Sequence, residues 1–226
     1  MPAYASLDRA ALRRRVVILG LATLALGVMA WAFAITSNQV HEHHVLLIPF
    51  SFVTLGMLIK YGDEAFDSRT FSRKLSTALS VPCGVWMGAL ILYDPGSATI
   101  MIGLLLALLV AAKYDNEAFR LGFVVAGAMA LASFLWFPAN ASLLGIAVVF
   151  AAAYADEVVS DKADTRSGRG WDVLRARPLL KVTVLVLCLT GVLPSLLYFF
   201  AFMGFDLGYS FVDAYARLRR YDSVTV

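Results

Sequence analysis

Long apolar stretches with no charged side chain near their middle constrain the fold of this chain more than any other feature. The hydrocarbon core of a bilayer is about 30 Å thick, and a helix needs roughly 17 to 25 apolar residues to cross it. Backbone groups inside a bilayer must be hydrogen-bonded within the chain, so such stretches predict an all-α, polytopic bundle of about seven transmembrane helices. The stretches are residues 16–36, 45–60, 75–93, 98–113, 121–137, 142–155 and 181–203.

The composition fits a membrane protein and argues against a soluble or nucleic-acid-binding one. Of the 226 residues, 60% are hydrophobic and only 15% are charged, whereas about 25% of the residues in a soluble domain are charged. Ala32 and Ala34 fit a signal-peptide cleavage site, but we expect the first stretch to be retained as an anchor. The prediction is a single transmembrane domain in the cell or plasma membrane, with a cytosolic N-terminus (1–15), a helical bundle (16–203) and an amphipathic C-terminal tail (204–226).

Lys and Arg are distributed unequally between the two ends of the predicted helices. Sixteen of the 19 lie before the first stretch or after the second, fourth and sixth stretches, and the intervening loops contain none. Basic loops remain on the cytosolic side, so the N-terminus is predicted to be cytosolic. The last three, Arg217, Arg219 and Arg220, do not fit, because a seventh crossing would place them outside. Either the tail is translocated or residues 181–214 enter the membrane and return; we expect seven crossings.

A short acidic phrase occurs three times in the chain. It reads KYGDEAF at 60–66, KYDNEAF at 113–119 and AYADEVV at 153–159, and each copy follows an even-numbered stretch. All copies share Tyr-x-(Asp/Asn)-Glu, and their tyrosines are 53 and 40 residues apart. Each interval contains one exit and one return across the membrane. This spacing predicts a leading helix followed by three two-helix repeats.

Two interpretations of the phrases remain open. A carboxylate near the C-terminal end of a helix is disfavoured by the helix dipole, so three such clusters require compensation. Nearby Lys and Arg side chains could pair with them, or converging carboxylates could bind a divalent cation as a cofactor. The candidate metal ligands are Asp63, Glu64, Asp67, Glu117, Asp156, Glu157 and Asp161. The candidate substrate-binding residues are Tyr61, Tyr114, Tyr154, Arg69 and Arg166.

The remaining sequence features limit the class of function. No ionisable residue lies near the middle of a stretch, which argues against a proton-coupled transporter. Phosphate-loop and nucleophile-elbow motifs are missing as well. The basic segment 156–177 could bind anionic lipid headgroups or a partner membrane protein. We therefore expect a membrane subunit or a transport or channel-like bundle with an acidic cytosolic face. The alternative is a metal-dependent enzyme acting on a lipid or isoprenoid phosphate at the cytosolic interface.

Overall fold

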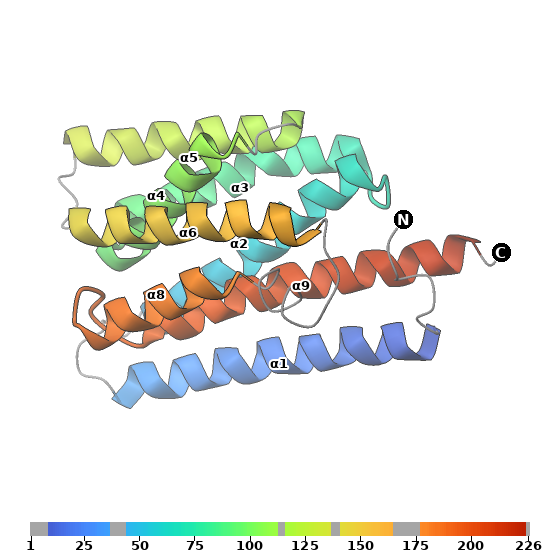
Figure 1. Cartoon of the computed structure of the whole chain (residues 1–226), viewed down its shortest axis with the longest axis horizontal. Coiled ribbons are helices and arrows are strands. Elements are labelled where there is room, and N and C mark those ends of the chain that lie inside the picture. Colours follow the sequence, from blue (N-terminus) through green and yellow to red (C-terminus); the bar gives the residue numbers. More distant parts are fainter. Residues whose placement is uncertain (1–8, 37–43, 113–115, 137–140, 165–176, 225–226) are drawn as a thin grey trace.

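The structure, a computed structural model, describes residues 9–36, 44–112, 116–136, 141–164 and 177–224. Within these ranges the chain is a bundle of α-helices without strands (Figure 1), which confirms the all-α prediction. Five described helices, α1, α2, α3, α5 and α6, are long and apolar enough to cross a membrane, and α4 and α8 are shorter apolar helices. The helices are α1 (Arg9–Thr36), α2 (His44–Asp67), α3 (Arg73–Tyr93), α4 (Pro95–Val110), α5 (Glu117–Trp136), α6 (Leu143–Asp164), α8 (Pro178–Leu189) and α9 (Leu197–Val224).

Each of the first six predicted stretches corresponds to one helix, but the seventh does not. Residues 181–203 are divided between α8 and α9, because α8 ends at Leu189 and Gly191 adopts a left-handed conformation with φ 77°. Glycine has no Cβ, so it adopts this conformation at helix ends without strain. The predicted tail, 204–226, is not a separate segment up to residue 224, because it continues α9.

Successive helices run in opposite directions, so the bundle has two distinct ends (Figure 1). At one end α2, α4, α6 and α9 finish and α1, α3, α5 and α8 begin; we call it the basic end, since Arg73, Arg120, Arg177 and Arg220 lie there. We call the opposite end, which includes His44, the far end. Because α9 returns to the basic end, its C-terminal arginines lie at the same end as the other described basic residues. This agrees with the second predicted topology, in which residues 181–214 enter the membrane and return.

Helices pack most extensively in the pairs α2–α9, α3–α5, α1–α9 and α4–α6. Glycines allow close approach in the first two of these pairs. A Cβ on Gly56 of α2 would overlap the carbonyl of Phe205 in α9, and a Cβ on Gly84 of α3 would overlap the carbonyl of Gly122 in α5. Small residues at helix crossings are the usual means by which helices pack closely in membranes.

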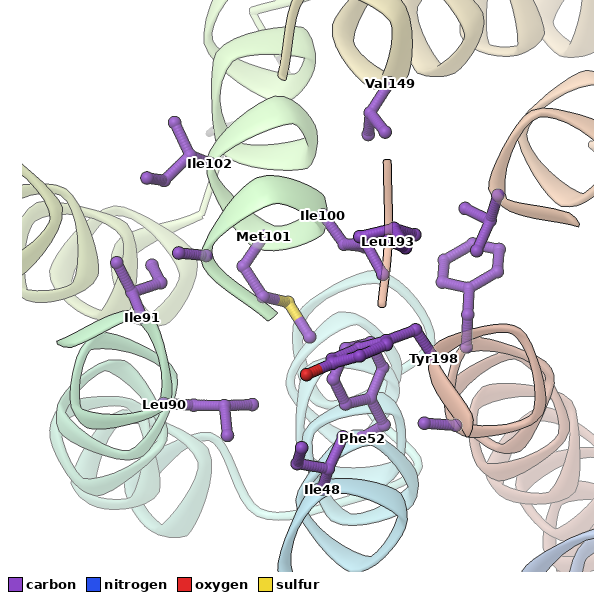
Figure 2. Packing of buried hydrophobic residues seen from close by; sticks show 14 of the residues in the cluster. Ile48, Phe52, Leu90, Ile91, Ile100, Met101, Ile102, Val149, Leu193 and Tyr198 are labelled. Atoms are coloured by element: carbon purple, nitrogen blue, oxygen red, sulfur yellow. The ribbon is translucent and has the colours of Figure 1, made fainter. Parts of the chain in front are cut away.

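The buried core contains residues of α2, α3, α4, α5, α6, α8 and α9, and part of it is shown in Figure 2. Phe52 of α2 and Met101 of α4 are fully buried there, and Tyr198 of α9 lies among them. By contrast, the apolar window of α1 has no buried residue, and this helix contacts the bundle mainly through α9. Its apolar surface is therefore suited to contact with lipid.

Candidate functional site

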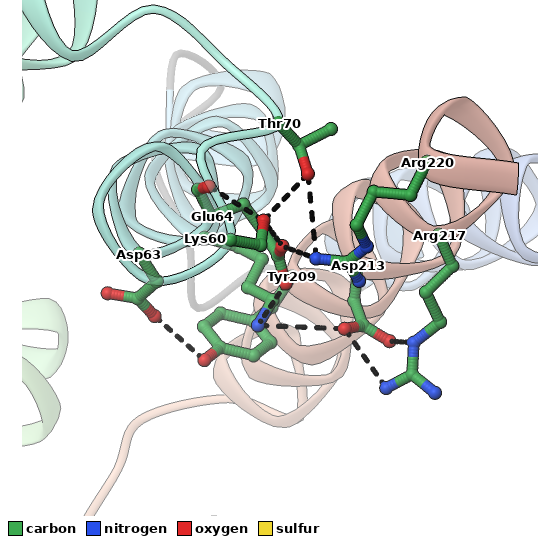
Figure 3. A network of polar contacts seen from close by, with 9 residues as sticks. Lys60, Asp63, Glu64, Thr70, Tyr209, Asp213, Arg217 and Arg220 are labelled. Atoms are coloured by element: carbon green, nitrogen blue, oxygen red, sulfur yellow. Dashed lines mark hydrogen bonds and ion pairs between the residues drawn. The ribbon is translucent and has the colours of Figure 1, made fainter. Parts of the chain in front are cut away.

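The first acidic phrase lies in the last turns of α2 and faces α9 (Figure 3). Glu64 is only 5% exposed. Its Oε1 lies 3.0 Å from Lys60 Nζ, and its Oε2 lies 2.8 Å from a guanidinium nitrogen of Arg220. The Ser68 hydroxyl donates to Oε2 at 2.6 Å. Two cations and a hydroxyl therefore satisfy this buried carboxylate, and one of the cations comes from the C-terminal helix.

The neighbouring residues extend the contact between α2 and α9. The hydroxyl of Tyr209 donates to Asp63 Oδ2 at 2.9 Å, and Lys60 Nζ lies 5.0 Å from the centroid of the Tyr209 ring. Asp213 Oδ1 is 3.6 Å from Lys60 Nζ, while its Oδ2 pairs with Arg217 Nε at 2.9 Å. Together with Glu64 and Arg220, these side chains form one continuous network at the basic end, which we call the α2–α9 network.

The turn after α2 supports this network with aromatic packing. Arg69 is exposed and has φ 54°, and its left-handed conformation reverses the chain so that Phe71 folds back onto α2. Tyr61 stacks on Phe71 with ring centroids 4.4 Å apart, and Tyr215 of α9 stacks on the other side at 6.3 Å. Tyr61, a predicted substrate-binding residue, is therefore part of a packed aromatic cluster.

The third phrase makes different contacts. Asp156 of α6 is 1% exposed, and its two carboxylate oxygens accept from the backbone N–H groups of Leu179 and Leu180 at 3.1 and 2.7 Å. These groups lie in the first turn of α8, and Arg177, the N-cap residue just before the helix, supplies no side-chain cap. Asp156 is thus an N-cap from another helix, because its oxygens satisfy donors that have no partner within α8. Glu157 pairs with Arg177 at 2.9 Å.

The second phrase caps the helix that follows it. Asn116 Oδ1 accepts from the N–H of Phe119 at 2.7 Å, at the start of α5, and Glu117 is exposed in the first turn. The first and third phrases lie inside α2 and α6, whereas the described part of the second begins a new helix. The three copies are therefore used in three different ways, and the two-helix repeat stays a prediction.

The candidate metal ligands that the structure describes do not form a metal site. Among the described residues, no group of three or more His, Cys, Asp or Glu side chains could hold a metal ion. Asp67 is exposed at the end of α2, and Tyr154 is exposed on α6 and stacks on Phe150. Three candidates fall outside what the structure describes, namely Tyr114, Arg166 and the side chain of Asp161.

A second buried polar cluster lies at the far end. Asp94 is 2% exposed and caps α4 by accepting from Ser97 N at 2.6 Å. Its other oxygen accepts from the Tyr198 hydroxyl at 2.7 Å and lies 3.7 Å from His44 Nδ1. The Asp-Pro pair in the sequence indicates the cap, but the contact with Tyr198 joins positions 104 residues apart, and no local pattern predicts it.

A largely apolar pocket of the described structure opens between α2, α3, α4 and α5 in the half of the bundle nearest the basic end. Counted with the space at its opening, it has an empty volume of about 620 Å³. Its polar lining residues lie mainly in the part near the basic end and are Tyr61, Asp63, Ser76, Ser80 and Asn116. The rest is largely apolar, with Leu79, Cys83, Met87, Leu105, Phe119 and Phe123 among the lining residues. We call it the α2–α5 pocket.

A basic surface adjoins this pocket. It is formed by the first turns of α3 and α5 and includes Arg73, Lys74, Glu117 and Arg120. Asn116 lines both the surface and the pocket. We call it the α3–α5 basic surface. The pocket and this surface are the part of the described structure best suited to bind a ligand, because an apolar space and a positively charged surface meet there. The chain matches no known family, no curated protein and no solved structure in the three comparisons made with it.

Proposed function

We propose that the chain is a multi-pass membrane subunit that acts through binding at its basic end, and that its first and third acidic phrases hold the bundle together. The observation that carries this proposal is the contact of Glu64 with Lys60 and Arg220. Through this contact the carboxylate of the first phrase, on α2, holds the C-terminal helix α9 against α2. The capping of α8 by Asp156 supports the same role for the third phrase.

We further propose that the basic end faces the cytosol. The support is that the described Lys and Arg lie at a single end of the helices (Figure 1), including Arg217 and Arg220 of α9, which contact residues of α2 or α9 at that end. Retention of basic segments on the cytosolic side is the general rule for multi-pass proteins. In this topology, α1 begins and α9 ends on the cytosolic side.

The contacts of the acidic phrases favour a subunit over the alternatives. A transport or channel-like bundle would direct all three phrases towards a shared opening. Asp63 and Asn116 of the first two phrases do line the α2–α5 pocket, but Glu64 is directed to α9 and Asp156 of the third phrase to α8. A metal-dependent enzyme acting on a lipid phosphate would need several oxygen ligands around one cation. Such a cation would have to displace Lys60 and Arg220 from Glu64, since both already lie within 3.0 Å of its carboxylate.

Magnesium titration of the purified protein separates the subunit from the metal-dependent enzyme. Wild type, Glu64→Gln and Glu157→Gln are compared by calorimetry in the same detergent. If the phrases are structural, Mg²⁺ gives the same heats with all three proteins, and Glu64→Gln unfolds more easily than wild type. Saturable binding of Mg²⁺ to the wild type that both variants lose would contradict the proposal and establish the acidic site.

A further inference from the structure

The α2–α5 pocket has the length and lining of a site for a hydrocarbon chain. Its α3 wall runs from Ser76 to Met87, which corresponds to about 16 Å at the 1.5 Å rise of an α-helix. Its α5 wall, from Asn116 to Ala126, is nearly as long. Half of a bilayer core measures about 15 Å, so the pocket covers the depth of one leaflet. An acyl chain occupies that depth.

The polar groups of the pocket lie where a lipid changes from chain to headgroup. Ser76 is 3% exposed, and its Oγ is buried without a hydrogen-bond partner in the described structure. A buried hydroxyl without a partner is unfavourable by about 1 to 3 kcal/mol. An ester carbonyl at the glycerol backbone of a lipid would accept a hydrogen bond from it. Ser76 is thus a second, independent indication of a ligand.

The charges determine which headgroup fits. The described residues of the α3–α5 basic surface include three basic side chains, Arg73, Lys74 and Arg120, and one acid, Glu117, which gives them a net positive charge. A phosphate would not enter the pocket itself, because the lining there is mostly apolar and includes the carboxylate of Asp63. It would be attracted to the basic surface, whose boundary with the pocket is Asn116.

We propose that the α2–α5 pocket and the α3–α5 basic surface together bind one anionic glycerophospholipid. An acyl chain lies in the pocket, the ester region lies beside Ser76, and the phosphate lies on Arg73, Lys74 and Arg120. The proposal requires the chain to lie in a membrane, but it depends neither on the subunit role nor on the orientation. A zwitterionic lipid would fill the pocket without using the charge of the basic surface.

The two cysteines offer a test that needs no substitution. Cys83 lines the pocket and Cys188 lies in α8 outside it. Alkylation of both by N-ethylmaleimide is followed by peptide mass spectrometry, with the protein in nonionic detergent. Dioleoyl phosphatidylglycerol at ten times its dissociation constant should slow alkylation of Cys83 about tenfold by mass action, and should leave Cys188 unchanged. Dioleoyl phosphatidylcholine should protect Cys83 only at much higher concentration.

Charge variants test the headgroup site. Lys74→Gln/Arg120→Gln should require about 30-fold more phosphatidylglycerol to protect Cys83, which corresponds to about 2 kcal/mol for two charges. The matched control, Arg13→Gln/Arg14→Gln, removes the same charge from α1 at the same end and should behave as wild type. Circular dichroism and monodisperse elution confirm that each variant is folded.

Three outcomes would overturn the proposal. The first is equal protection of Cys83 by phosphatidylglycerol and phosphatidylcholine, which would mean that the charge has no role. The second is wild-type behaviour of Lys74→Gln/Arg120→Gln. The third is protection by glycerophosphate at the concentration at which phosphatidylglycerol protects, since this headgroup without chains would then identify a site for a free phosphate.

Discussion

The carboxylate of Glu64 shows how a membrane bundle accommodates a charge near a helix end. It is buried, and it meets an ammonium, a guanidinium and a hydroxyl at hydrogen-bonding distance. Removing one partner of such a group is more costly than the contact itself is favourable, because the remaining charges stay partly buried without compensation. Arg220 is 38% exposed, so water reduces part of this cost on the α9 side.

Replacing Glu64 by Gln should therefore destabilise the protein. Gln keeps the shape but removes the charge that Lys60 and Arg220 share, and we expect the free energy of unfolding to fall by about 2 kcal/mol. Equilibrium unfolding in detergent measures the change. Asp67→Asn, in the same turn but exposed, should cost less than about 0.5 kcal/mol. Equal losses for the two variants would show that the network does not stabilise the bundle.

Asp156 should show a graded response, because it caps α8 through two hydrogen bonds. Asp156→Ala removes both acceptors and should lower the free energy of unfolding by about 1 to 2 kcal/mol. Asp156→Asn keeps one acceptor and should cost less. Hydrogen exchange adds a local readout, since the amides of Leu179 and Leu180 should exchange faster in the Ala variant. Unchanged exchange at these two amides would contradict the capping role.

At the scale of the elements, α3 and α5 depend on glycine for their closest contact. Gly84 and Gly88 are four residues apart on α3, and a Cβ on either would overlap α5. The spacing is that of a small-xxx-small face. It is used here inside one chain, so this face of α3 is already covered by α5.

Two glycine substitutions should change stability in opposite directions. Gly84→Ala places a methyl group against the carbonyl of Gly122 and should destabilise the bundle by about 1 to 3 kcal/mol, as other overpacked sites do. Gly127→Ala, in α5, meets no atom within 4 Å and should be neutral or stabilising by up to about 1 kcal/mol, since Ala favours helix. Equilibrium unfolding of both variants tests this. A Gly84→Ala protein as stable as wild type would show that the helices separate without cost.

The last helix carries its polar contacts on one face. Tyr209, Asp213, Arg217 and Arg220 recur at i, i+4, i+8 and i+11, which places them on one side of α9. The amphipathic tail predicted for residues 204–226 also has apolar positions at helical spacing, Phe211, Tyr215 and Leu218. The polar spacing was visible in the sequence, but its partners on α2 were not.

At the scale of the whole molecule, the turn between α8 and α9 determines the topology. With this turn, α1 begins and α9 ends at the same end of the bundle (Figure 1). Without it, the seventh predicted stretch would carry Arg217, Arg219 and Arg220 to the far end. Because the turn divides the seventh predicted stretch into two helices, the three C-terminal arginines lie at the basic end and not at the far end.

Topology reporters should detect this arrangement. We expect a fluorescent protein fused after residue 226 to fluoresce in a bacterial host and alkaline phosphatase fused there to be inactive, because each reporter works on only one side of the membrane. A phosphatase inserted in the loop 37–43 should be active, since that loop joins α1 to α2 at the other end. Active phosphatase at the C-terminus would restore the seven-crossing topology.

Much of this fold was determined by the sequence alone, because apolar stretches of bilayer length have no alternative to helices in which to satisfy their backbone groups. The all-α class and the first six helices follow from that, and the Asp-Pro pair separately indicates the cap at Asp94. The partners of the polar residues were decided only by tertiary structure. Glu64 pairs with Arg220 at a separation of 156 residues, and Asp156 caps a helix that begins 22 residues later. Similar phrases acquire different contacts because a carboxylate binds the donors that packing places beside it, and local sequence does not encode that placement.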